Sequence, residues 1–146
     1  MKIIFVTREG YNLAGARVRA YNFSKALEER GLDTEVLSYA ECLGAGDGIN
    51  ERKMGFFEKL RYNVRAYKKL EKEKDAIIVL QRVNYHTLSV LAARVIRKNR
   101  IILDMDDWEI REDPRYILGF YPTSKAEYLP EKLPGYPSSV QREAFI

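Results

Sequence analysis

The chain has 146 residues, of which 46% are hydrophobic and 32% charged, and its formal net charge at pH 7 is +4. These values are typical of one globular domain, and the small positive charge is only weak evidence for anionic ligands. The single cysteine excludes an internal disulfide, and the single histidine excludes a histidine-rich metal cluster. No apolar run is long enough to span a membrane, and the apolar stretch at the N-terminus is too short for a signal peptide.

Three short apolar runs, over residues 3–7, 75–80 and 101–105, predict strands of a parallel sheet. Val36 and Leu37 predict a fourth strand over residues 33–39. The segments between the runs predict helices, so the chain repeats a strand–helix unit. This order predicts a doubly wound, Rossmann-like α/β fold of three layers, with helices on both faces of the sheet.

Apolar residues recur at helical spacing in three of the segments between strands. They are Ala16, Ala20, Phe23 and Leu27 in the first, Phe57, Leu60, Val64, Tyr67 and Leu70 in the second, and Leu88, Leu91, Ala92 and Val95 in the third. Gly31 is a stop signal for the first helix, residues 56–73 form the second, and Thr87 caps the third. Three glycines predict a mobile loop over residues 41–50.

The composition changes near residue 114, because all five prolines follow that point. We therefore expect a Rossmann-like domain over residues 1–113 and an irregular, proline-rich tail or extension over residues 114–146. No further strand–helix unit can be read in the tail, so the predicted sheet of four strands looks unfinished.

Residues 8–17 connect the first strand to the first helix and form the first candidate site. Ligands of open α/β sheets bind at this end of the strands, and the glycines allow close approach to an anion. Arg17 and Arg19 lie where the helix dipole disfavours cations, which indicates a bound phosphate or carboxylate. The alternative is that they pair with a carboxylate such as Glu9 or point into water. Neither a P-loop nor a dinucleotide fingerprint is present.

The second candidate site follows the fourth strand and reads Asp104-Met105-Asp106-Asp107-Trp108. Clustered carboxylates repel one another unless they have partners, and acids beside an aromatic ring suit sugar recognition. In the alternative interpretation one acid caps a helix and Trp108 fills the core. A cation bound by Asp-x-Asp is a third, less favoured interpretation.

The third candidate site follows the third strand and reads Gln81-Arg82-Val83-Asn84-Tyr85-His86, in which Arg82, Asn84 and His86 could bind a ligand. These groups lie at the same sheet edge as the other two sites, although a lone histidine near a helix start is usually a surface or capping residue. No nucleophile–base arrangement involving Cys42 can be argued.

The predicted helix within residues 51–74 is rich in lysine and arginine and carries Phe56 and Phe57. A basic and aromatic helix can dock on anionic lipid. The favoured interpretation is a crossover helix whose apolar face packs on the sheet and whose basic face is solvated. Nucleic acid is not an expected partner, because no base-reading motif accompanies the charges.

The sequence resembles the N-terminal domain of GT-B-fold glycosyltransferases of the family 4-like group. Three stretches of residues 1–110 carry this resemblance: the strand at residues 3–7, AGARVRAYNFSKALEERGLDTEVLSY, and DAIIVLQRVNYHTLSVLAARVIRKNRIILDMDDWE. The pair QR…DMDDW is the more specific part. The chain departs from the family at the Asp-Asp-Trp turn, where members often carry a histidine.

The resemblance implies the acceptor-binding half of a metal-independent and retaining glycosyltransferase. The expected location is the cytoplasm, and the basic helix is the candidate for peripheral contact with the inner face of the membrane. A nucleotide-sugar donor would bind a C-terminal half that this sequence lacks, so the chain is expected to be inactive by itself. Asp106 and Asp107 are the expected catalytic residues and orient an acceptor hydroxyl. The expected substrate-binding residues are Arg8, Gly15, Ala16, Arg17, Arg82, His86 and Trp108. Two alternatives stay open: a non-catalytic ligand-binding or regulatory α/β module, and a nucleotide-binding enzyme of another doubly wound family.

Overall fold

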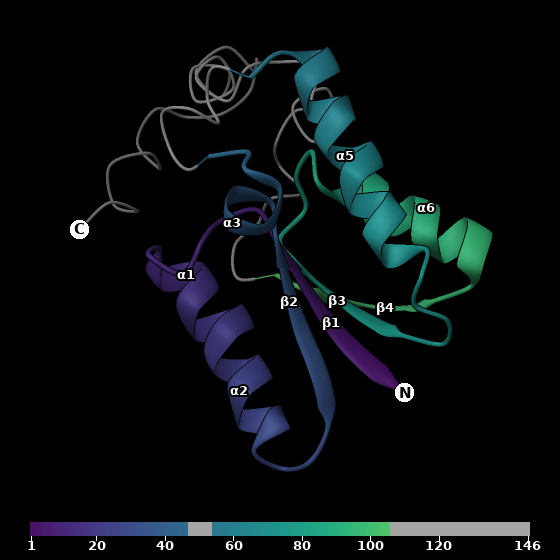
Figure 1. Ribbon diagram of the computed structural model, residues 1–146. Helices are drawn as coiled ribbons and strands as arrows, with labels where there is room; N and C mark the ends of the chain where they lie inside the picture. The colour runs from purple at the N-terminus through teal and green to yellow at the C-terminus, as the bar shows by residue number, and fades with distance from the viewer. Residues whose placement is uncertain (47–53, 106–146) are drawn as a thin grey trace, which may run out of the picture.

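Figure 1 shows a computed structural model of the chain, in which residues 1–46 and 54–105 are described. The predicted domain boundary at residue 113 and the proline-rich tail lie outside the described residues. Among the described residues, no helix has the length and apolarity needed to cross a bilayer.

The centre of the fold is a sheet of four parallel strands in the order β2-β1-β3-β4. The strands are β1 (Lys2–Thr7), β2 (Asp33–Ser38), β3 (Ile77–Gln81) and β4 (Arg100–Asp104). Each lies within two residues of its predicted position, so the prediction of a parallel α/β fold is confirmed. Neighbouring strands pair in register, for example Val6 with Leu37 on one side and with Leu80 on the other.

Helices lie on both sides of this sheet (Figure 1). A continuous helical segment made of α1 (Ala14–Ala16), η1 (Arg17–Asn22) and α2 (Phe23–Glu28) runs along one side. On the other side, α5 (Phe56–Leu70) and α6 (Thr87–Arg97) pack against each other. The short helix α3 (Tyr39–Leu43) follows β2, so part of the predicted loop over residues 41–50 is helical.

The first helical segment differs from its prediction because η1 is π-helical. A π-helical turn takes up an additional residue and rotates the chain that follows it. The residues buried against the sheet are Ala16, Ala20 and Ser24, each four positions after the last. Phe23, which was predicted to share the apolar stripe, is 59% exposed, and the Ser24 hydroxyl contacts the Thr34 hydroxyl at 2.9 Å.

The prediction that α5 packs its apolar face inward holds for Tyr67 and Leu70 and is wrong for the rest of that face. Phe57 is 82% exposed, and Leu60 and Val64 are also exposed. The buried residues of α5 are Lys59, Tyr62, Asn63, Ala66 and Leu70. The same reversal occurs in α6, where Leu91 is exposed and Val95 is 77% exposed. The buried residues of α6 are Ser89, Val90 and Ala93.

A buried polar network explains why the helices turn these sides inward. The Asn63 carboxamide oxygen accepts hydrogen bonds from the Ser89 N–H at 3.0 Å and from the Tyr39 hydroxyl at 3.1 Å. Its nitrogen donates to the carbonyl oxygens of Lys59 and Tyr85, both at 2.9 Å. Asn63 therefore joins α5 to α6 and to the segment before α6, with its whole hydrogen-bonding capacity used.

Candidate functional site

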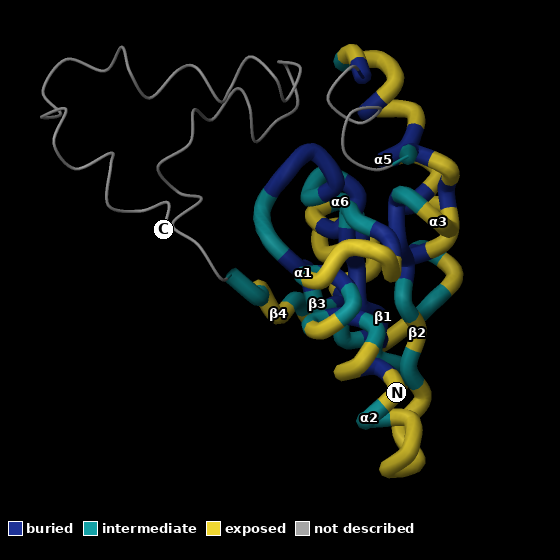
Figure 2. The backbone as a smooth tube through the Cα atoms, turned by 90° about the vertical axis from the view of Figure 1, so that its left-hand side faces the viewer, coloured by how far each residue is buried: buried dark blue, intermediate teal, exposed yellow. Residues whose placement is uncertain are grey.

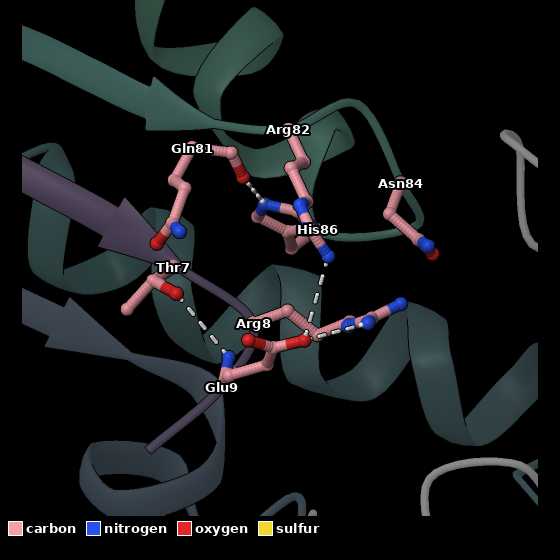
Figure 3. A pocket seen from close by; sticks show the side chains of 7 residues that line it. All are labelled: Thr7, Arg8, Glu9, Gln81, Arg82, Asn84 and His86. Carbon is pink, nitrogen blue, oxygen red and sulfur yellow. Dashed lines mark hydrogen bonds and ion pairs between the residues drawn. The ribbon is translucent and has the colours of Figure 1, made fainter. Parts of the chain in front are cut away.

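A polar pocket lies between the carboxyl ends of β1 and β3. The chain leaves β1 towards β2 on one side, and it leaves β3 towards β4 on the other. Such a topological switch point is where open parallel sheets bind ligands. The enclosed cavity is small, with a volume of about 10 Å³, and it opens directly to solvent. Its lining residues are Thr7, Arg8, Glu9, Gln81, Arg82, Asn84 and His86 (Figure 3).

Charged groups from both strand ends meet across the pocket. The Glu9 carboxylate lies 2.9 Å from Nη2 of Arg8 and 3.8 Å from Nη1 of Arg82. Figure 3 shows Arg82 reaching from the loop after β3 towards Glu9. Two guanidinium groups around one carboxylate leave the trio with a net positive charge. The pocket therefore favours an anionic group on a ligand.

The backbone at Arg82 is held in the left-handed region, with φ of 62°. A non-glycine residue there costs about 1–2 kcal/mol. The Arg82 N–H donates to the Asp104 carbonyl at 2.9 Å, which fixes this turn to the end of β4. The strain is therefore located directly in the pocket wall.

Two buried acceptor atoms in the pocket lining have no hydrogen-bond partner among residues 1–46 and 54–105. His86 is fully buried, and its Nε2 lies 3.1 Å from the Gln81 carbonyl oxygen. Because a carbonyl only accepts, Nε2 carries the hydrogen and Nδ1 is left as an acceptor. The two atoms without a partner in the described part of the chain are Nδ1 of His86 and Oε1 of Gln81. An unsatisfied buried acceptor is costly, so both atoms favour a ligand that donates hydrogen bonds.

Burial, helped by the nearby positive charge of Arg8, lowers the pKa of His86 to about 3. The unfolded chain, with an ordinary histidine pKa near 6.5, therefore binds a proton that the folded chain rejects. This pKa difference therefore adds to the free energy of unfolding. The full contribution is present above pH 6.5, and it is lost as the pH falls towards 3. We expect about 1.4 kcal/mol less stability at pH 5.5 than at pH 7.5 from this group.

Urea unfolding at the two pH values tests this expectation, with His86→Gln as the comparison. The variant should lack this part of the decrease between pH 7.5 and 5.5. An equal decrease in both proteins would show that His86 is not the group responsible.

Three of the residues predicted to bind substrate line the pocket: Arg8, Arg82 and His86. Gly15 lies beside it, because a Cβ added there would be 3.5 Å from Oε2 of Glu9 and 3.8 Å from Nε2 of Gln81. Ala16 is the last residue of α1 and is fully buried, so the prediction that it contacts substrate is not supported.

The arginines of the first candidate site have partners within the chain. The Arg17 guanidinium lies 5.9 Å from the centre of the Tyr11 ring. Nη1 of Arg19 lies 2.7 Å from the Asp104 carboxylate, so Arg19 follows the alternative of pairing with an acid, although the acid is not Glu9.

The loop after β1 also uses its N–H groups internally. Those of Glu9, Tyr11 and Leu13 donate to the Thr7 hydroxyl, the Glu41 carboxylate and the Gly10 carbonyl. These N–H groups are therefore occupied within the chain, and the cationic side chains that line the pocket are Arg8 and Arg82.

Asp106, Asp107 and Trp108 lie outside the described residues. Met105 is the last residue described before them, and the Arg82 N–H···Asp104 bond places that end of β4 at the pocket turn. Within residues 1–46 and 54–105, no cluster of three or more histidine, cysteine or acidic side chains is arranged to hold a metal ion.

The expected substrate-binding set does not include four residues that line the pocket, namely Thr7, Glu9, Gln81 and Asn84. Thr7 and Gln81 end β1 and β3, and Glu9 lies two residues after β1; this position at the strand ends is the feature by which they could have been included. Glu9 was considered only as a partner of the helix arginines, whereas it lies between Arg8 and Arg82.

Comparison of the chain with protein-family models, curated protein sequences and solved structures finds no significant match in any of the three. The functional argument therefore depends on the residues of the pocket.

Proposed function

We propose that this chain is the acceptor-side, Rossmann-like domain of a glycosyltransferase, and that its pocket binds a sugar bearing an anionic group. The observation that carries the proposal is the pair of buried acceptors, Nδ1 of His86 and Oε1 of Gln81, in a pocket that also holds Arg8 and Arg82. Sugar hydroxyls donate to the acceptors, and a phosphate or carboxylate pairs with the guanidinium groups.

In this proposal His86 positions a hydroxyl and does not remove its proton, because a pKa near 3 makes it a weak base. Asp106 and Asp107, which follow the end of β4, are the proposed catalytic residues, and Trp108 covers an apolar sugar face. The nucleotide-sugar donor is held by a separate C-terminal domain without a metal ion. The doubly wound arrangement of the whole domain and its cytoplasmic location belong to the same proposal.

The low pKa of His86 supports a second candidate, a non-catalytic ligand-binding module. Such a module needs the hydrogen-bonding groups of the pocket but no group that exchanges a proton near neutral pH. Both candidates require the pocket to bind, and they differ in whether transfer occurs when a donor-binding domain is attached.

Titration of the ¹⁵N-labelled chain with glucose, inorganic phosphate and glucose 1-phosphate tests the proposed ligand. We expect glucose 1-phosphate to bind most tightly and to shift the amide signals of Gln81, Arg82 and His86. Gln81→Leu should lower the affinity for glucose 1-phosphate by about tenfold, because one sugar hydroxyl loses its acceptor. The affinity for inorganic phosphate should stay unchanged. Lys25→Gln, on the exposed part of α2, is the control. Equal affinity for phosphate and sugar phosphate would contradict a sugar site.

A further inference from the structure

The helices α5 and α6 expose apolar side chains on their outer sides. On α5 these are Phe57, Leu60 and Val64, spaced three and four residues apart, and on α6 they are Leu91, Val95 and Ile96. The opposite sides of both helices are buried through Asn63, Ala66, Val90 and Ala93. The two helices pack against each other on one side of the sheet (Figure 1), and Figure 2 shows exposed residues along α5 in yellow. We call these six apolar residues the outer apolar surface.

Basic side chains accompany the outer apolar surface along both helices. They are Arg61, Arg65 and Lys68 on α5, Arg94 and Arg97 on α6, and Lys98 directly after α6, and all six are exposed. On α5, Arg61 and Lys68 follow Phe57 and Val64 by four residues, so they share one helical side with them. Glu58 and Glu71 are the acidic residues of this helix and its C-cap, so the helix remains strongly positive.

Exposed apolar residues interleaved with cations match the chemistry of one particular partner. In an interfacial helix, apolar side chains enter the boundary between headgroups and acyl chains while lysine and arginine bind anionic headgroups. A purely apolar protein partner would have to desolvate these cations at its centre, which is costly. Charge complementarity therefore favours an anionic lipid surface as the occupant.

We propose that the outer apolar surface docks the chain on an anionic lipid bilayer, lying on it without crossing it. The sequence-based hypothesis placed membrane contact on the basic helix alone. In the structure, α6 also exposes apolar and basic side chains. The exposed side of α5, which the favoured sequence interpretation described as basic and solvated, carries apolar residues as well. This proposal is independent of the ligand bound at the switch-point pocket.

Co-sedimentation of the 146-residue chain with lipid vesicles tests the proposal. Vesicles of phosphatidylcholine alone should bind little protein, whereas equal parts of phosphatidylcholine and phosphatidylglycerol should bind it, less so as salt is added. Phe57→Ser with Val95→Ser should reduce the partition coefficient by at least about tenfold. Lys68→Gln with Arg97→Gln should reduce it by a similar factor, because each basic residue near such a surface contributes about fivefold.

Phe23→Ser and Lys25→Gln on α2 are the matched controls, since both residues are exposed on the other side of the sheet. They should leave binding unchanged, and circular dichroism should show that every variant folds. Equal binding to both kinds of vesicle, or none, would overturn the proposal. Sedimentation velocity without lipid gives a second test. If the chain is a dimer and the double variant Phe57→Ser with Val95→Ser is a monomer, the surface is an interface between copies and the proposal fails.

Discussion

Asn63→Ala is expected to lower the free energy of unfolding by about 3 kcal/mol or more, which is among the largest effects that a single substitution produces. The carboxamide makes four hydrogen bonds in a buried position. One of them satisfies the N–H of Ser89, which lies in the first turn of α6 and has no carbonyl partner within that helix. Alanine removes all four bonds and leaves a small cavity between the helices. Urea denaturation at neutral pH measures the change.

Asn22→Ala is the matched control, because Asn22 is exposed at the end of η1. Its effect on the free energy of unfolding should stay within about 0.5 kcal/mol. If Asn63→Ala costs less than about 1 kcal/mol, the network does not hold α5 and α6 together. The reversed orientation of the two helices would then need another explanation.

Arg82→Gly is expected to weaken glucose 1-phosphate binding by at least about tenfold without destabilising the chain. Glycine adopts a positive φ without steric cost, which offsets its larger loss of backbone entropy. The free energy of unfolding should therefore stay constant or rise by up to about 1 kcal/mol. Affinity should fall because one of the two guanidinium groups of the pocket is lost. Calorimetric titration and urea unfolding of the same preparation give both values.

Lys98→Gly provides the comparison, since Lys98 has φ of 60° at the C-cap of α6 and does not line the pocket. It should raise stability by up to about 1 kcal/mol and leave ligand affinity unchanged. A clear loss of stability in Arg82→Gly, with affinity retained, would mean that Arg82 serves the fold and not the ligand.

Strand positions were predictable from the sequence, whereas the inward sides of the helices were not. A run such as Ile3 to Val6 is apolar on both faces, so the strand can be located without predicting which face is buried. On α5 and α6 the apolar spacing was real, but it marks the outer side. The inner side contains Asn63, which accepts a hydrogen bond from the Ser89 N–H, and the Ser89 hydroxyl, which donates to the His86 carbonyl. A pattern read one segment at a time does not contain that pairing.

The pocket was predictable to the extent that it depends on topology. Arg8, Arg82 and His86 follow strands whose carboxyl ends meet, and the expectation that they lie at one sheet edge is confirmed. The unsatisfied acceptors and the left-handed turn at Arg82 depend on tertiary contacts. Glu9 was missed because its two arginine partners come from different parts of the chain.

The edge strand β4 carries a consequence for local unfolding. Ile102 is 54% exposed and Leu103 is 47% exposed, and although Ile101 packs against the core, β4 is only partly covered by the described residues. Strands with so little cover open more readily than the centre of a sheet, and their amides exchange first. Opening of β4 would release the carbonyl that holds the Arg82 turn and the carboxylate that pairs with Arg19. A partner that covered β4 would therefore raise ligand affinity from a distance, by suppressing this fraying and without touching the ligand.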